Sequence, residues 1–436
     1  MWLEVFRSRR MAVLFVLGFS SGLPLYLTGS TLQAWLTSEQ VSLDRIAAFS
    51  LVGLAYTFKW AWAPLVDWHA WPFLGRRRGW VLVTQLGLVA SIAAMGMVDP
   101  ETQPFALAAL AIAVAVFSAS QDVVLDAYAT DLLAPHERAA GSSIYVIGYR
   151  VAMMLTGTIA LIMADHVTWR LIYTTMAVLM GIGIVGTVFA EEPPRPAKRI
   201  TFDEAFYLPV VEFVRRYGSR TALVLGFVAV YKFGDFFAQA LLLVFLKSGS
   251  PVDLSQVPPA ELPAAFAKAM SSLVVRRGAG FRFTDIALVY KLLGFGGIFL
   301  GGFAAGSLAA KFGVRRMLIV FGVMQALTNL LYAWLAVTGK SYAIFGTAVL
   351  LDNLTGAMGT ATFVAVQMSM CTPAVSATQY ALLTSLTSVG QRVFGPLADN
   401  LVAAVGWSGF FACTSLMAIP GLVLAALLPR DDRGMS

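Results

Sequence analysis

The sequence is poor in charge, since only 13% of its 436 residues are Asp, Glu, Lys or Arg, whereas soluble domains carry about 25%. Its two cysteines, Cys371 and Cys413, exclude a disulfide framework and supply no metal-ligand spacing. Three histidines lie near the ends of apolar runs, at His69, His136 and His166, and no nucleophile–base set accompanies them. The sequence therefore predicts no metal, no cofactor and no enzyme activity.

Apolar residues are abundant, at 58% of the chain, and the mean hydropathy is +0.75. They fall into runs that are each long enough to cross the hydrocarbon core of a bilayer. The sequence predicts an all-α integral membrane protein with twelve transmembrane helices. The predicted spans are 11–36, 44–63, 80–98, 105–131, 138–164, 168–190, 220–247, 284–310, 314–338, 342–371, 376–400 and 407–429.

Basic residues are concentrated in alternate connections between these spans, while the other connections carry few cations. Because loops rich in Lys and Arg stay in the cytoplasm, this asymmetry predicts that both termini are cytoplasmic. The same bias explains the net charge of +7 without nucleic-acid binding. The basic stretches are 75–78, 136–138, 195–220, 311–316 and 430–433.

The longest basic connection, 191–220, divides the predicted spans into an N-terminal half (1–190) and a C-terminal half (221–436). A short motif recurs in both: Gly75 and Gly313 each follow an even-numbered span and precede arginines. Repeated six-helix halves are typical of the major facilitator fold. The C-terminal half also contains a predicted periplasmic insertion, 248–284, whose amphipathic stretch 259–275 is expected to form a short surface helix.

Charged side chains interrupt several apolar spans, where each costs about 2.5–3.5 kcal/mol and persists only when it is paired, hydrated or functional. We expect Asp122 to pair with Arg150 at mid-depth, Lys59 to extend to the interface, and Asp126 and Asp131 to bind arginines of the basic connections. Such pairs could also serve only to hold helices together. The ten charges are Lys59, Asp122, Asp126, Asp131, Arg150, Lys232, Asp235, Lys291, Asp352 and Arg392.

Several ordered motifs make the chain resemble a known family. They include Ser118-Ala-Ser-Gln-Asp122, Tyr231-Lys-Phe-Gly-Asp235 and Ser376-Ala-Thr-Gln-Tyr380, within matching stretches that span positions 17 to 388. In this set the chain resembles the AmpG-type muropeptide permeases of Gram-negative bacteria, a branch of the major facilitators. The resemblance implies proton-driven import of N-acetylglucosaminyl-anhydromuramyl peptides across the inner membrane by alternating access, for wall recycling and β-lactamase induction.

The chemistry of such a ligand suggests which side chains meet it. Cations can bind its carboxylates, amides can bind its hydroxyl and peptide groups, and tyrosines can stack on its sugar faces. The candidate substrate residues are Gln33, Tyr56, Gln121, Tyr145, Tyr149, Arg150, Lys232, Gln239, Lys291, Asn353, Gln367 and Arg392. The candidate proton carriers are Asp122, Asp126, Asp235 and Asp352. Resemblance to the facilitator motif that links helices two and three implies gating by Asp67, Gly75, Arg76 and Arg77.

Other functions remain open at this stage. A facilitator-type exporter, or a carrier of another anionic solute such as acetyl-CoA, would share the same architecture. The expected partners are the muropeptide, protons and inner-membrane lipid, and the expected state is a monomer.

Overall fold

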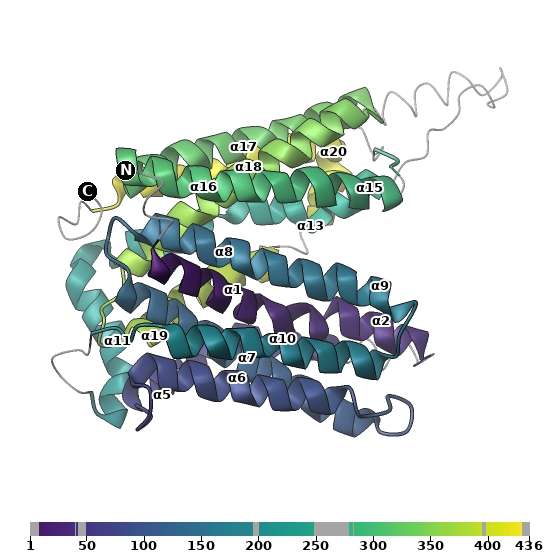
Figure 1. The fold of residues 1–436 in the computed structure, drawn as a ribbon. Helices are drawn as coiled ribbons and strands as arrows, with labels where there is room; N and C mark the ends of the chain where they lie inside the picture. Colours follow the sequence, from purple (N-terminus) through teal and green to yellow (C-terminus); the bar gives the residue numbers. More distant parts are fainter. Residues whose placement is uncertain are drawn as a thin grey trace, which may run out of the picture. The chain divides into compact units, whose positions relative to one another are not determined.

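The computed structural model describes residues 8–39, 41, 49–194, 200–247, 279–281, 283–394 and 398–429, and all regular secondary structure among them is helical (Figure 1). Ten helical segments of these described ranges are long and apolar enough to cross a membrane. The chain forms two compact units. Unit 1 contains residues 1–218 and 364–385, and unit 2 contains residues 219–363 and 386–436.

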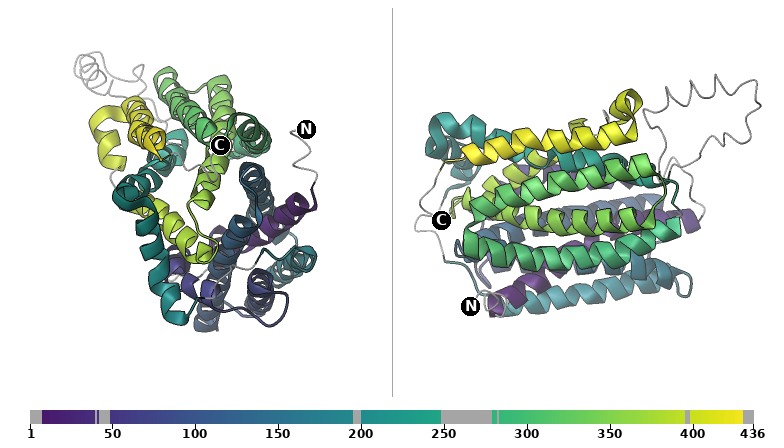
Figure 2. Two further views of the ribbon diagram at one scale, coloured as in Figure 1. Left: turned by 90° about the vertical axis from the view of Figure 1, so that its left-hand side faces the viewer. Right: turned by 90° about the horizontal axis from the view of Figure 1, so that it is seen from above.

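Unit 1 is built mainly from long helices that run side by side, as the views in Figures 1 and 2 show. One shorter helix, α11, runs across their direction at one end (Figure 1). The helices are α1 (Arg9–Leu27), α2 (Ser30–Ser38), α4 (Leu54–Phe58), α5 (Ala63–Trp68), α6 (Arg76–Met95), α7 (Pro104–Leu132), α8 (Arg138–Met154), α9 (Ala160–Ala164), α10 (Trp169–Phe189) and α11 (Phe202–Tyr217).

Glycines bring α1 and α8 into backbone contact. A Cβ atom added to Gly18 would lie 2.2 Å from the carbonyl oxygen of Tyr145, and one added to Gly22 would lie 2.3 Å from that of Tyr149. From the other side, a Cβ atom on Gly148 would lie 2.2 Å from the carbonyl oxygen of Phe15. Small residues four apart allow this approach in membranes, where tight packing replaces the hydrophobic effect as the force between helices.

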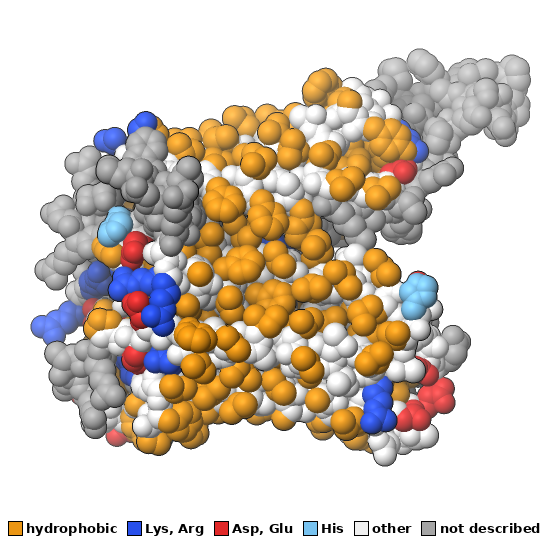
Figure 3. Space-filling view, in the orientation of Figure 1, with side chains coloured by type: hydrophobic (Ala, Val, Ile, Leu, Met, Phe, Trp, Pro, Cys, Tyr) orange, Lys and Arg blue, Asp and Glu red, His pale blue; other side chains and the backbone are white. Residues whose placement is uncertain are grey.

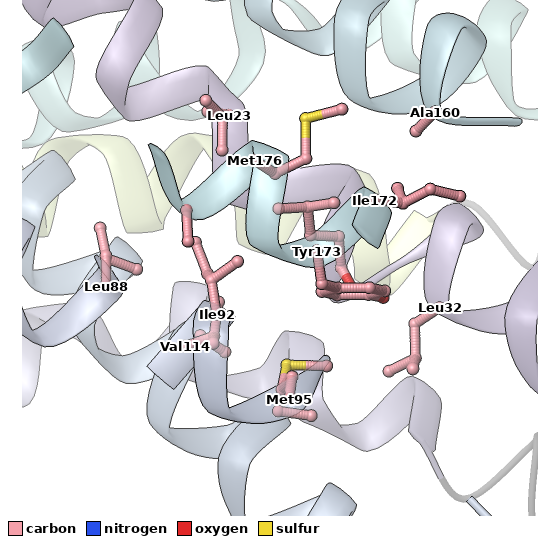
Figure 4. Close-up of a cluster of buried hydrophobic side chains, with 14 of the residues drawn as sticks. Leu23, Leu32, Leu88, Ile92, Met95, Val114, Ala160, Ile172, Tyr173 and Met176 are labelled. Atoms are coloured by element: carbon pink, nitrogen blue, oxygen red, sulfur yellow. The ribbon is translucent and has the colours of Figure 1, made fainter. Parts of the chain in front are cut away.

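A buried apolar cluster fills the space between the helices of unit 1 on the side away from the basic connections (Figure 4). Leu23 of α1, Ile92 of α6, Val114 of α7 and Met176 of α10 all lie in it with almost no exposed surface. Tyr173 anchors the cluster to α1, because its hydroxyl donates to the carbonyl oxygen of Leu27 at 2.9 Å. The cluster therefore fixes α1 against α6, α7 and α10.

Unit 2 contains a helix pair that is interrupted in mid-span. The pair is α12 (Thr221–Val230) and α13 (Phe233–Lys247), and Tyr231 and Lys232 lie at the break. A Cβ atom on Gly234 would lie 2.5 Å from the carbonyl oxygen of Thr414, so this segment packs closely on α20. The other helices that contribute to unit 2 are α15 (Phe283–Val289), α16 (Phe295–Phe312), α17 (Val314–Thr338), α18 (Tyr342–Ser369), α19 (Ser376–Phe394) and α20 (Ala398–Leu427).

The surface agrees with a membrane setting. In Figure 3 hydrophobic side chains cover the middle stretch of the helices, and most visible Lys, Arg, Asp and Glu side chains lie near helix ends. The exposed apolar residues include Phe105, Val178 and Leu292, which are 89%, 72% and 71% exposed. Such exposure is unfavourable in water but suits helices surrounded by lipid.

The structure changes several predicted boundaries. The first predicted span, 11–36, divides into α1 and α2 around Gly29, and the second, 44–63, is a series of short helical pieces between residues 50 and 68. The basic connection 191–220, in which no helix was predicted, contains the 16-residue helix α11. The predicted surface helix 259–275 lies outside the described residues, as does most of the insertion 248–284.

Candidate functional site

Four charged residues form a balanced cluster at the end of unit 1 where α6 begins. Arg77 has no exposed side-chain surface; its Nη2 lies 2.9 Å from Oδ1 of Asp67, and its Nε lies 2.9 Å from Oδ2 of Asp131. Arg76 adds a second bond to the same Asp131 oxygen at 2.8 Å. We call Asp67, Arg76, Arg77 and Asp131 the latch cluster. The expectation that Asp131 binds loop arginines is confirmed.

The latch cluster also holds the first turn of α19. The carboxylate of Asp67 accepts backbone N–H groups of Ala377 at 3.2 Å and Thr378 at 2.8 Å, together with the Thr378 hydroxyl at 2.8 Å. Arg77 Nη2 donates to the Ser376 hydroxyl at 2.6 Å. A carboxylate at a helix N-terminus satisfies free N–H groups and meets the positive end of the helix dipole. Asp67 therefore links α19 to α6.

Gly75 shapes the start of α6. Its φ of +96° lies in the region that favours glycine, and an added Cβ atom would lie 2.5 Å from the Glu192 side chain. That side chain accepts backbone N–H groups of Arg77 and Arg78 at 2.9 Å and 3.1 Å. Gly313, the matching glycine of the sequence motif, has φ +86° before α17. Both glycines of the repeated motif thus have a positive φ directly before a helix.

The loop between α18 and α19 lies next to the latch cluster, directly before the helix start that Asp67 binds. Cys371 lies in the loop, is 7% exposed, and its thiol donates to the carbonyl oxygen of Gln367 at 3.3 Å. Burial raises the pKa of the thiol, and the nearby carboxylate of Asp131 acts in the same direction. The thiol is therefore neutral and poorly reactive while the loop stays packed.

A second polar group lies deeper in unit 1, where α7 faces α1 and α8. The hydroxyl of Ser21 donates to Asp122, and the hydroxyl of Tyr145 donates to Ser21 at 2.8 Å. The expected pair between Asp122 and Arg150 is wrong: no ion pair joins them among the described residues, and Arg150 is exposed. The physical reason is helical spacing, because Tyr145 and Tyr149 occupy the face of α8 beside α1.

Lys59 also differs from its expected place. Its ammonium nitrogen lies 3.6 Å from Oδ2 of Asp126, and its side chain is only 12% exposed. The expectation that Lys59 extends to the interface is wrong, because Asp126 supplies a partner inside the unit. The expectation that Asp126 binds an arginine of the basic connections is also wrong, because among the described residues its ion pair is with Lys59. Asp122, one turn away on α7, has a hydroxyl as its partner.

The other candidate side chains of unit 1 are scattered. Gln33 is exposed on α2, and Tyr56 and Tyr149 are partly buried. Gln121 has no exposed surface, and its amide nitrogen donates to Ser20 at 2.7 Å within the packing of α1 and α7. Gln367 is 2% exposed on α18. The ligand roles of these five residues stay predictions.

Unit 2 holds a lysine–carboxylate pair at the break between α12 and α13. Lys232 Nζ lies 3.2 Å from Oδ2 of Asp235 and donates to Oε1 of Gln325 on α17 at 2.8 Å. Tyr231, beside it, donates its hydroxyl to the carbonyl oxygen of Leu318 at 2.7 Å and stacks on Phe363. The interrupted helix therefore places a buried cation where two helix segments meet.

Asp352 of α18 is held by neutral donors. Gln239 Nε2 donates to it at 3.0 Å, the Thr328 hydroxyl at 3.3 Å and the Tyr332 hydroxyl at 3.4 Å. No ion pair to Asp352 occurs within the described ranges, although the side chain is 7% exposed. It can therefore exchange a proton without breaking a salt bridge. The adjacent Asn353 donates to the Val349 carbonyl oxygen of its own helix.

Two candidate cations are not placed. The side chains of Lys291 and Arg392 lie outside the described residues. Sequence reasoning missed several partners that complete these groups, namely Ser21, Glu192, Gln325, Thr328 and Thr378. Ser376 carried a usable signal, because Ser is common at helix starts and the first N–H groups of a helix need acceptors.

Comparison with known proteins decides the family. The model of the Major Facilitator Superfamily matches residues 11–390. An anhydromuropeptide permease of Escherichia coli K12 is 41% identical over 97% of this chain and 80% of its own. The chain belongs to the major facilitators, in the branch of the AmpG-type permeases. This facilitator is a transporter and not an enzyme, and it is a multi-pass membrane protein.

Further relatives agree on the family. An uncharacterized protein of Haemophilus influenzae is 34% identical, covering 95% of this chain and 93% of its own. A putative transporter, AmpG 4 of Rickettsia felis, is 30% identical and covers 98% of both chains. Among solved structures, a proton:xylose symporter bound to a bromodeoxyglucose has a TM-score of 0.68 at 12% identity, covering 99% of this facilitator and 97% of its own chain. That likeness supports the fold alone.

Proposed function

We propose that this facilitator imports N-acetylglucosaminyl-anhydromuramyl peptides from the periplasm to the cytoplasm across the bacterial inner membrane. The observation that carries the proposal is the 41% identity with the E. coli anhydromuropeptide permease over 97% of the chain. Import would serve wall recycling and β-lactamase induction. In this proposal the basic connections and both termini face the cytoplasm, as the distribution of Lys and Arg favours.

Proton coupling is part of the same proposal, with Asp122, Asp126, Asp235 and Asp352 as candidate carriers. Asp122 and Asp352 are supported best, because their direct partners are hydroxyl and amide groups. Protonation of either would cost no ion pair. Asp126 and Asp235 would have to release Lys59 or Lys232 first. A substrate carboxylate that attracts Lys232 could provide that release in unit 2.

Alternating access requires an element that closes the cytoplasmic side. The latch cluster suits this role, because its paired charges are buried and Asp67, one of its members, also holds the first turn of α19. Movement of α19 away from α6 would expose the cluster to water and hydrate its charges. Asp67, Gly75, Arg76 and Arg77 are therefore proposed as the gate.

The decisive experiment measures uptake by proteoliposomes that contain the purified protein. A proton gradient directed into the vesicles is imposed across their membrane. Labelled anhydromuropeptide is offered alone and in competition with unlabelled acetyl-CoA. We expect saturable uptake that an uncoupler reduces and acetyl-CoA does not affect. Uptake that is independent of the gradient would contradict proton coupling, and transport of acetyl-CoA in place of the muropeptide would overturn the substrate.

A further inference from the structure

The helix α11 (Phe202–Tyr217) has an apolar face that no described part of unit 1 covers. Its 16 residues rise about 24 Å, too short for the hydrocarbon core, and it carries five charged side chains. It is therefore not a membrane span. Thr201 and Glu204 form a capping box, with each side chain accepting from the other residue's backbone N–H, so the helix begins at a defined position.

The residues of α11 divide into three faces. Ala205, Pro209 and Phe213 are buried against unit 1. Glu204, Glu212 and Arg215 follow a polar side. The remaining face is apolar apart from the exposed Asp203 in the first turn, and its apolar side chains are 46% to 53% exposed: Phe206, Tyr207, Val210, Val211 and Val214. At 3.6 residues per turn, the centres of the apolar and polar faces are separated by about 120° around the helix axis.

The position of α11 indicates what covers the apolar face. In Figure 1 it crosses the direction of α6, α7 and α10 at their ends, so it runs parallel to the plane of the membrane that these helices span. Trp68 packs edge-on against Phe202 with ring centroids 5.1 Å apart, and these two side chains are 43% and 46% exposed. Tryptophan and other aromatic residues concentrate at the membrane–water interface. The apolar face thus continues an aromatic rim at the edge of the bilayer.

The polar contacts of α11 lead to the loop and helix that the latch cluster holds. Gln379 of α19 donates its amide to the Pro209 carbonyl oxygen at 3.0 Å and to Glu212 at 2.7 Å. Its own side-chain oxygen accepts from the backbone of Thr372 at 2.7 Å. Arg216 donates to the carbonyl oxygen of Met370 at 3.3 Å. The helix is therefore attached to both ends of the loop that contains Cys371.

We propose that α11 is seated in the lipid surface of the membrane by its apolar face and that this seating holds the start of α19 in place. A helix with a wide apolar face and a separate charged side binds at the headgroup–acyl boundary. The lipid contact fixes the height of α11, and Gln379 transmits that position to the residues that Asp67 binds. The proposal depends on the membrane setting and not on the identity of the transported solute.

The test compares two labelled positions, Val210→Cys near the centre of the apolar face and Arg215→Cys on the polar side, about 140° away around the helix axis. Both are made with Cys371→Ser and Cys413→Ser, labelled with an environment-sensitive fluorophore, and reconstituted with lipids that carry a nitroxide high on the acyl chain. We expect blue-shifted emission and several-fold stronger quenching at position 210. Equal quenching at the two positions would overturn the proposal. Blue-shifted emission at 210 without nitroxide quenching would also overturn it, in favour of a protein partner or a second copy.

The second arm measures the transmission to α19. The variant Val210→Ser with Val211→Ser removes apolar contact at exposed positions, so it leaves the packing of unit 1 intact. Arg215→Gln is the matched control. With Cys371 retained and Cys413 replaced by Ser, we expect several-fold faster alkylation of Cys371 in the double variant and no change in the control. An unchanged rate in the double variant would overturn the claim that lipid seating holds α19.

Discussion

Asp352 is a buried carboxylate that neutral groups hold in place. Gln239, Thr328 and Tyr332 can all bond to an Asn side chain at this position, so Asp352→Asn should fold normally. It cannot carry a proton, however, and we expect uptake to lose its pH dependence. Asp122→Asn should behave in the same way, because Ser21 can still bond to the amide oxygen. Uptake measured between about pH 5.5 and 8, the range in which folded proteins are usually most stable, checks both variants.

The matched control is Asp99→Asn in the connection before α7. The backbone N–H of Glu101, followed by that of Thr102, lowers the pKa of this exposed carboxyl, so it stays ionised at every pH of the assay. Its replacement should leave the profile unchanged. If Asp122→Asn and Asp352→Asn both keep the original profile, the carriers lie elsewhere, and Asp126 and Asp235 become the next candidates.

Arg150 and Lys232 are expected to bind substrate carboxylates, yet their surroundings differ. Both Arg150→Ala and Lys232→Ala should abolish uptake, and Arg150→Lys should restore little, because an ammonium lacks the paired donors of a guanidinium. Arg150 is exposed, so its loss should not change the melting temperature. Loss of Lys232 strands Asp235 and should cost about 3–5 kcal/mol of stability.

Thermal melting beside uptake distinguishes binding from folding at these two positions. The double variant Lys232→Met with Asp235→Asn removes both charges and should regain most of the stability but not the uptake. Full uptake by Arg150→Ala would refute its substrate role. Full uptake by the double variant Lys232→Met with Asp235→Asn would refute a substrate role for Lys232.

At the scale of helices, the contact between α1 and α8 depends on glycine. Gly18→Leu would place a side chain against the Tyr145 backbone at a distance that no rotamer relieves, so α1 must move away from α8. We expect a loss of at least about 1–3 kcal/mol, the usual cost of overpacking. Gly181→Ala on α10 is the control, because nothing lies within 4 Å of its added Cβ atom. Melting of the two purified variants checks the difference; equal melting would show that the approach is not tight in solution.

The attachment of α19 to α6 can be followed through Cys371. In the variant Asp67→Ala, the first turn of α19 loses three bonds, and Arg77 is left with one buried carboxylate. Water should then reach Cys371 and return its pKa toward the ordinary value, which increases the thiolate fraction about tenfold for each pKa unit recovered. We expect alkylation of Cys371 to be at least about tenfold faster in Asp67→Ala than in the unmodified protein, with Cys413→Ser in both.

Asp165→Asn, an exposed change at the opposite end of unit 1, should leave the alkylation rate as it is. Because the pKa of the Cys371 thiol is raised, its thiolate fraction, and with it the alkylation rate, should increase with pH. The unmodified protein should react slowly at neutral pH and faster only as the pH approaches the raised value. No acceleration in Asp67→Ala would argue against a gate at this cluster.

For the whole molecule, hydropathy and loop charge predicted the all-helical membrane fold and the facilitator architecture, because long apolar runs have few other solutions. The breaks inside spans were not predictable in the same way. Gly29 and the segment at Lys232 interrupt helices inside apolar runs, where hydropathy predicts a continuous helix. The helix α11 was not predicted, although Thr201 and Glu204 have the residue types and spacing of a capping box.

In the candidate site, too, some contacts could be predicted from the sequence and others could not. Asp131 could be assigned to the arginines because both lie near one membrane face and opposite charges there attract. The pair of Asp122 with Arg150 failed, since depth along a helix does not specify direction around it. Ser21 and Gln325 were overlooked because uncharged polar residues give little signal in an apolar span. Partner identity depends on rotation and packing, which one sequence does not display.

Residues 364–385 belong to unit 1 although they come from the C-terminal part of the chain. A gene divided within the connection 195–199 would therefore produce an N-terminal fragment without the first turn of α19. In that fragment the carboxylate of Asp67 would lose the N–H and hydroxyl donors of α19. We expect this fragment alone to be degraded, and its abundance to recover when residues 200–436 are co-expressed as a second polypeptide. Immunoblots of the two strains would check this, and a fragment stable by itself would contradict it. The two parts of such a facilitator cannot be exchanged freely between relatives, because each fragment carries part of the other's folding information.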